Sequence, residues 1–184
     1  MRFALLLLTG CAVGPRGQYV NTMWDQTGTA LVSHNLGTGL RLRATYLSND
    51  FRRALADERH RLLADPDAEA AAFLAATLDD NTAFHEVVFT AESDLIDDLR
   101  FGESDDTRFQ LRLEADGTPQ PLVTVYKVRR VTPLHEALYA HKNIWNELWI
   151  ARFERTVAAP SEVRLQVAGG YGNDEITWTG DQLR

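Results

Sequence analysis

Histidine is the side chain best suited to move protons or bind metals near neutral pH, and this chain of 184 residues contains five. His135 and Glu136 could begin the His-Glu-x-x-His pattern of zinc proteases, in which two histidines four positions apart reach one metal ion from one face of a helix. The next histidine is His141, six positions on, so the pattern fails. Histidines from different segments, such as His85 and His135, could still meet in the folded chain.

Acidic side chains concentrate in one polar segment, residues 93–106. They are Asp94, Asp97, Asp98, Glu103, Asp105 and Asp106. Calcium ions are held by such oxygen ligands, but this segment lacks the spaced aspartates and the glycine of an EF-hand loop. No pair stands out for glycoside hydrolysis, whose two carboxylates are matched in space and not in sequence. The segment is therefore expected to be a solvated loop, and no metal site is predicted.

Two further catalytic patterns fail. The Gly-x-Ser-x-Gly turn of serine hydrolases is absent from the sequence. The run Gly169-Gly170-Tyr171-Gly172 is similar to a phosphate-binding loop, but no Lys-Ser or Lys-Thr follows it. It also lies between two expected strands, whereas a phosphate-binding loop precedes a helix. A hairpin turn is expected there, and the sequence predicts no catalytic residue and no cofactor.

Aromatic side chains are the remaining candidates for binding. Trp145 and Trp149 are four positions apart, so they would lie on the same face of either a strand or a helix. An exposed pair could stack on sugar rings or anchor a protein partner. The alternative is that both tryptophans fill the core. Tyr139 and His135, a few positions earlier, complete the set of candidate binding residues.

Strands are the elements that must position these residues. Leu40, Leu42, Ala44 and Tyr46 alternate with other side chains, a period of two that predicts a strand with one buried face. Further strands are expected at about residues 29–36, 85–90, 109–114, 122–131, 144–157, 163–167 and 175–179, with one helical turn within 134–142. Short strands separated by turn signals favour a mostly antiparallel β-sandwich, which we expect to be immunoglobulin-like.

Two helices are expected between the second and third strands, near residues 49–79. Ser48-Asn49-Asp50 supplies residues that cap helix N-termini, and apolar residues follow at helical spacing. Asp65-Pro66 then predicts the start of the second helix, because proline is tolerated in the first helical turn. The predicted fold is therefore mainly β with a helical insert, and the domain is expected to span residues 28–184.

The composition narrows the class of protein. Apolar residues make up 45% and charged residues 24%, as in folded globular proteins. The net charge of −7 argues against nucleic acid as a partner, since phosphate binding requires a basic face. The single cysteine excludes an intramolecular disulfide and a multi-cysteine zinc site. No apolar run approaches the roughly 20 residues of a membrane-spanning helix.

The first eleven residues are typical of a secretory signal: one basic residue, an apolar run over Phe3–Leu8, and then small residues. Leu8-Thr9-Gly10-Cys11 resembles the lipobox of bacterial lipoproteins. The resemblance implies that residues 1–10 are a signal peptide and that Cys11 becomes the acylated first residue of the mature chain. The signal is short, so it is either minimal or begins upstream of Met1. The alternative is that the apolar run starts a buried element and that Cys11 is an ordinary buried thiol.

The same resemblance implies a location. Lipoproteins of this family are held in the membrane by acyl chains, palmitate among them, and a residue other than aspartate after the cysteine, here Ala12, implies the outer membrane facing the periplasm. Residues 11–27 lack periodicity and include Gly14, Pro15 and Gly17. They are expected to form a lipid-anchored tether, with Trp24 as the first residue to dock onto the domain.

The expected function is that of a lipid-anchored, non-catalytic binding or assembly module of the bacterial envelope. Its expected contacts are the membrane, through the acyl chains, and an envelope protein of unknown identity. One alternative is a small-ligand receptor or an unrecognised enzyme whose site is assembled from distant segments. Another is a structural envelope protein whose main activity is self-association.

Overall fold

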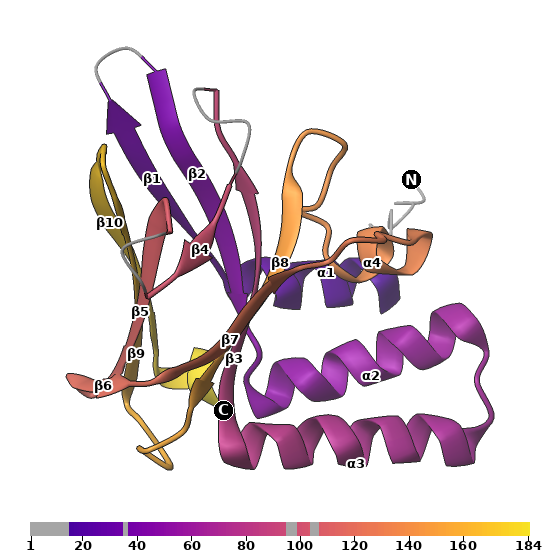
Figure 1. The fold of residues 1–184 in the computed structure, drawn as a ribbon. Coiled ribbons are helices and arrows are strands. Elements are labelled where there is room, and N and C mark those ends of the chain that lie inside the picture. Colours follow the sequence, from indigo (N-terminus) through magenta and orange to yellow (C-terminus); the bar gives the residue numbers. More distant parts are fainter. Residues whose placement is uncertain (1–14, 35–36, 95–98, 104–106) are drawn as a thin grey trace, which may run out of the picture.

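Two β-sheets pack face to face, and helices cover the outer face of one of them (Figure 1). This computed structural model describes residues 15–34, 37–94, 99–103 and 107–184. Sheet A has the strand order β1-β2-β3-β8-β7, and its neighbouring strands are antiparallel. Its strands are β1 (Thr27–His34), β2 (Gly37–Tyr46), β3 (Phe84–Glu92), β8 (Glu147–Glu154) and β7 (Leu122–Lys127).

Sheet B has the strand order β10-β9-β5-β4, with the short strand β6 beside β5. Its strands are β10 (Gly172–Thr179), β9 (Glu162–Gly169), β5 (Phe109–Ala115), β4 (Phe101–Gly102) and β6 (Thr118–Gln120). The pair β4–β5 is parallel, whereas the other pairs described in this sheet are antiparallel. The helices are α1 (Pro15–Asp25), α2 (Asn49–Leu63), α3 (Asp67–Ala83), α4 (Pro133–Leu138) and the 3₁₀ turn η1 (Gly180–Leu183).

The core between the sheets follows from alternation along the strands. On β2, Leu40, Leu42, Ala44 and Tyr46 are buried in the inter-sheet core, as their period of two predicts. The central strand β3 is buried on both faces: Phe89 belongs to the inter-sheet core, and its neighbour Val88 belongs to a second core under the helices. Sheet A is therefore the middle layer of the molecule.

The second core joins the helices to sheet A. It contains Tyr19, Met23, Leu47, Phe51, Leu55, Val88, Leu138, Tyr139 and Leu148. Helix α2 begins where predicted, because the Ser48 hydroxyl accepts a hydrogen bond from the backbone N–H of Phe51, and it ends at Ala64 in the left-handed conformation. Helices α2 and α3 run side by side beneath the sheet (Figure 1).

A mainly β fold with a helical insert is confirmed, and the insert extends from Asn49 to Ala83, past the predicted limit of residue 79. Some strand limits were wrong. The strand predicted over 144–157 begins only at Glu147, because residues 139–146 form a loop, and the strand predicted over 122–131 ends at Lys127.

The expected tether over residues 11–27 also differs from the structure where the structure describes it. Pro15–Asp25 is helix α1, and Tyr19 and Met23, four positions apart, are buried against the rest of the molecule. Pro15 is the first residue of the helix, where a missing N–H costs nothing, so its presence is compatible with a helix in this segment. The signal peptide of residues 1–10 and Cys11 lie outside the described residues.

The two sheets approach closely at Gly28, and this predicts an effect on stability. A Cβ atom added at Gly28 would lie 2.1 Å from the Cγ2 atom of Ile176 on β10. We therefore expect Gly28→Ala to lower the free energy of unfolding by about 1–3 kcal/mol, as overpacking does, in urea titrations. Gly170→Ala is the matched control, since nothing lies within 4 Å of its Cβ position. Equal stability of the two variants would contradict this close approach.

Candidate functional site

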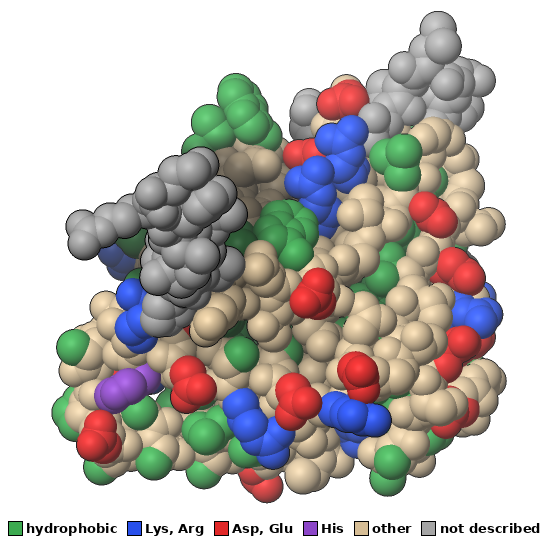
Figure 2. Space-filling view, turned by 180° about the vertical axis from the view of Figure 1, so that it is seen from behind, with side chains coloured by type: hydrophobic (Ala, Val, Ile, Leu, Met, Phe, Trp, Pro, Cys, Tyr) green, Lys and Arg blue, Asp and Glu red, His purple; other side chains and the backbone are tan. Residues whose placement is uncertain are grey.

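The loop between α4 and β8 projects two large apolar side chains into solvent. Ile144 and Trp145 are each 81% exposed. The turn beneath them is held by hydrogen bonds: the Asn143 side chain accepts from the Trp145 backbone N–H at 2.8 Å, and the Asn146 side chain accepts from the Asn143 N–H at 3.1 Å. We call Ile144 and Trp145 the loop tip. In Figure 1 the loop rises above α1 and α4, and Figure 2 shows hydrophobic side chains projecting there.

His141 forms the base of this loop. Its buried imidazole lies between two hydroxyls of sheet A, with Nε2 3.0 Å from Thr45 Oγ1 on β2 and Nδ1 3.1 Å from Thr90 Oγ1 on β3. Its backbone carbonyl accepts a hydrogen bond from the Asn146 side chain at 2.9 Å. One histidine therefore ties the loop tip to the two strands beneath it.

Helix α1 packs against the same loop. The Tyr19 hydroxyl donates to the Leu138 carbonyl at 2.5 Å, and the Ala140 N–H donates to Met23 Sδ at 3.2 Å. The Trp24 ring lies edge-on to the His141 ring, with 6.3 Å between ring centroids. Trp24 is 43% exposed, so it extends the apolar surface from the loop onto α1.

Acid should destabilise the fold through His141. Burial, and to a smaller degree the charge of Arg43, lowers the pKa of His141 from 6.5 to about 4. Between these values the unfolded chain binds a proton that the folded chain does not, so the free energy of unfolding falls as the pH falls. We expect this residue to account for a loss of about 3 kcal/mol between pH 6.5 and pH 4, measured by urea titrations.

The variant His141→Gln isolates this contribution. At pH 7 the variant should be less stable than the wild type, whose neutral imidazole makes both hydrogen bonds. Below pH 6.5 the stability of the variant should decline less steeply than that of the wild type. Above pH 7 the imidazole is neutral in both states, so the two curves should run parallel. The same steepness in both proteins below pH 6.5 would show that His141 is not kept neutral by the fold.

The candidate binding residues are separated by the structure. Trp149 is only 8% exposed and stacks on Phe89 in the inter-sheet core, so it fills the core as the second of the two expectations had it. Trp145, in contrast, is at the surface. Tyr139 is buried among the residues under the helices. His135 caps its own helix, because its Nδ1 accepts a hydrogen bond from the Thr132 N–H at 3.2 Å.

The other histidine considered for a composite site is also buried. His85 Nδ1 lies 2.8 Å from the Tyr46 hydroxyl, and burial lowers the pKa of His85 to about 3. In the acidic segment, Asp97, Asp98, Asp105 and Asp106 lie outside the described residues, and the Glu103 carboxylate accepts a hydrogen bond from the Leu122 N–H. Among the residues that the structure describes, no group of three or more histidine, cysteine or acidic side chains could hold a metal ion.

Sequence reasoning missed a buried ionic cluster. The Arg52 guanidinium donates to the Glu86 carboxylate at 3.2 Å, to Thr77 at 2.7 Å and to the Leu47 carbonyl at 3.0 Å. Arg152 lies 3.4 Å from the same Glu86 carboxylate. Together with Tyr139 these groups border a hollow of about 230 Å³ between α2, α3 and sheet A. The sequence did contain a signal for this cluster, because Glu86 directly precedes the apolar run Val87-Val88-Phe89 of a buried strand, where a charge has to find a partner.

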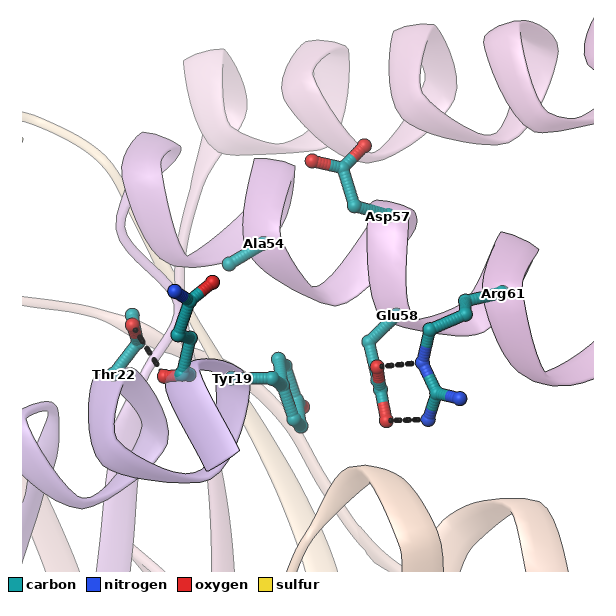
Figure 3. A pocket seen from close by; sticks show the side chains of 7 residues that line it. Tyr19, Thr22, Ala54, Asp57, Glu58 and Arg61 are labelled. Carbon is teal, nitrogen blue, oxygen red and sulfur yellow. Dashed lines mark hydrogen bonds and ion pairs between the residues drawn. The ribbon is translucent and has the colours of Figure 1, made fainter. Parts of the chain in front are cut away.

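A second hollow, of about 280 Å³, lies between α1 and α2 (Figure 3). Tyr19 and Thr22 border it from α1, and Glu58 and Arg61 border it from α2. The Arg61 guanidinium makes two hydrogen bonds of 2.7 Å to the Glu58 carboxylate, and these hold the pKa of Glu58 below its usual value. Arg16 lies 3.4 Å from the same carboxylate, so these charges fasten α1 to α2.

The described architecture defines the class as a mostly β protein of two sheets, one of them covered by helices. Within the described part of the chain, no helix has the length and apolar character needed to cross a membrane.

No family model matches the sequence, and no curated protein matches it either. A solved structure, a protein of unknown function from Burkholderia pseudomallei, is similar over 92% of this chain and 85% of its own length, with 13% identity and a TM-score of 0.39.

Proposed function

We propose that this chain is a lipid-anchored protein of a bacterial envelope, in the outer membrane facing the periplasm, and that it acts as a non-catalytic binding module. The observation that carries the binding activity is the loop tip, where Ile144 and Trp145 are 81% exposed on a hydrogen-bonded turn. Large apolar side chains held in water are typical of surfaces that bind something else. The anchor rests on the lipobox-like sequence that ends at Cys11.

The surroundings of the titratable side chains support a non-catalytic module. His85, His135 and His141 each make hydrogen bonds within the fold, and they lie in different places. The carboxylates of Glu58 and Glu86 are paired with arginines. These groups therefore stabilise the fold. For this fold we propose an immunoglobulin-like sandwich, because the two sheets enclose one core.

The anchor is tested by Cys11→Ala. We expect the wild-type protein in the membrane fraction with the mass of an acylated chain starting at Cys11, and the variant in the soluble fraction. The effect should be nearly complete, because each buried CH₂ group contributes about 0.8 kcal/mol and two or more acyl chains anchor a protein stably. Trp145→Ala is the control and should remain in the membrane fraction. Equal amounts of wild type and Cys11→Ala in that fraction would contradict the proposed anchor.

The loop tip is tested separately with a photocrosslinking amino acid at position 145 in cells. We expect covalent adducts from this position and none from position 123, where Val123 is also exposed but lies on β7 away from the loop. Adducts from neither position would contradict a binding role for the tip, whatever the state of Cys11.

A further inference from the structure

We infer that the loop tip docks onto the lipid surface beside the protein's own acyl anchor, so that the domain touches the bilayer at two points. This inference rests on the proposed function, since it takes Cys11 as the anchored residue. It adds the identity of what Trp145 binds, which is a lipid interface. The length of the link to the anchor, the packing of α1 and the shape and chemistry of the tip all place the tip at the lipid surface.

The link between anchor and domain is very short. Three residues, 12–14, separate Cys11 from Pro15, where α1 begins. A fully extended chain advances about 3.5 Å per residue, so Pro15 can lie at most about 14 Å from the anchored residue. A long tether would let the domain move away from the bilayer, whereas this one holds the start of α1 close to it.

Helix α1 brings the loop to the same place. A helix rises about 1.5 Å per residue, so Met23 lies only about 12 Å along the axis from Pro15. Met23 Sδ accepts the hydrogen bond from Ala140, and the Tyr19 hydroxyl, about one helical turn earlier, donates to the Leu138 carbonyl. Residues 138–140 lead directly into the loop, and the loop rises above α1 and α4 in Figure 1. The short link therefore holds both the helix and the loop near the membrane.

The chemistry of the tip suits the boundary between water and lipid. Tryptophan combines a large apolar surface with an N–H donor, and it is enriched at both interfaces of membrane proteins. Ile144 beside it is purely apolar, and the half-exposed Trp24 lies at the foot of the loop against His141. Lys142, on the same loop, adds a positive charge beside the tip that attracts lipid phosphate groups, although its ammonium also donates to the Asn143 carbonyl.

The shape of the tip favours a lipid surface over a protein. Stable protein interfaces bury about 800 Å² on each partner, whereas here two adjacent side chains project from a loop in which the preceding residues, Lys142 and Asn143, are polar. A narrow projection of this kind can enter a headgroup layer. Its weak affinity is sufficient, because the anchor makes docking an intramolecular step with a high effective concentration.

The test uses the full acylated protein, purified from membranes and reconstituted into vesicles of phosphatidylethanolamine and phosphatidylglycerol. Some of the lipids carry bromine near the headgroup, because bromine quenches tryptophan fluorescence on contact. We expect brominated vesicles to quench wild-type emission more strongly than Trp145→Phe emission, because Trp149 and Trp178 are buried and Trp24, present in both proteins, is less exposed than Trp145. The matched control adds Val123→Trp to Trp145→Phe, and its new indole on β7 should remain unquenched by bromine.

The outcomes separate this inference from the proposed function. If the protein has the mass of an acylated chain and bromine quenches wild type and Trp145→Phe equally, docking is overturned and the anchor stands. If the mass shows no acyl chains, the anchor itself is overturned, and docking with it. If Trp145 is shielded from aqueous acrylamide in native envelope membranes but not in pure lipid vesicles, the tip binds a protein and the lipid assignment is wrong.

Discussion

Arg52→Ala should lower the free energy of unfolding by about 3–5 kcal/mol, the usual result of breaking a buried ion pair from one side. The Arg52 side chain is 1% exposed, and its three hydrogen-bonding groups bind Glu86, Thr77 and the Leu47 carbonyl. Without it, the buried Glu86 carboxylate keeps Arg152, at 3.4 Å, and the Leu47 carbonyl loses the hydrogen bond from the Arg52 side chain. Urea titrations at pH 7 provide the measurement.

The adjacent residue supplies the control. Arg53 is exposed and pairs with Asp50 at the surface, where such pairs contribute about 1 kcal/mol or less. Arg53→Ala should therefore have a small effect, although it removes the same side chain one position away. Adding Glu86→Gln to Arg52→Ala should recover part of the loss, because the unpaired charge is removed. A small effect of Arg52→Ala alone would show that water reaches this cluster and compensates Glu86.

Trp178→Ala should cost about 3–5 kcal/mol, the range for truncating a large buried aromatic side chain. Trp178 is fully buried between the sheets, its ring lies against Tyr46 with 5.6 Å between centroids, and its indole N–H donates to the Gln26 carbonyl at 2.9 Å. The substitution opens a cavity and removes one of two donors to that carbonyl, which keeps the Tyr46 N–H at 3.3 Å. Thermal and urea unfolding should both report the loss.

Trp145→Ala is the matched control for this prediction, because it truncates the same residue type at a site that is 81% exposed. Its stability should stay within about 0.5 kcal/mol of the wild type. Trp178→Phe should fall between the two variants, since it keeps much of the packing but loses the hydrogen bond to Gln26. If Trp145→Ala were as destabilising as Trp178→Ala, the loop tip would be part of the core.

The strands could be predicted because their signal is local. The alternation through Leu40, Leu42 and Ala44 places one face in the core whatever the partner strand is, and the structure agrees. Helix α2 could likewise be recognised from the Ser48 cap. Helix α1 could not, because Tyr19 and Met23 are buried through long-range contacts. Tyr19 stacks on Phe51 of α2, and both residues bind a segment about 120 positions later in the chain.

The position of the candidate site is also set by contacts between residues far apart in the sequence. Whether Trp145 belongs to a strand or a loop depends on where β8 begins, and Asn146 ends the loop by binding the His141 carbonyl. His141 is in turn placed by Thr45 and Thr90, which lie 96 and 51 positions earlier. No local pattern around Trp145 contains those contacts. The period of four between Trp145 and Trp149 therefore suggested a pair, whereas the fold separates them.

The distant partners of α1 also affect the order of events during folding. Residues 15–25 are synthesised early, yet Leu138 and Ala140, which bind two of their side chains, follow more than a hundred residues later. Contacts of such large sequence separation form late in folding. Helix α1 therefore lacks these partners until the last third of the chain has been synthesised. We expect α1 to complete its packing late, when the loop after α4 folds against it.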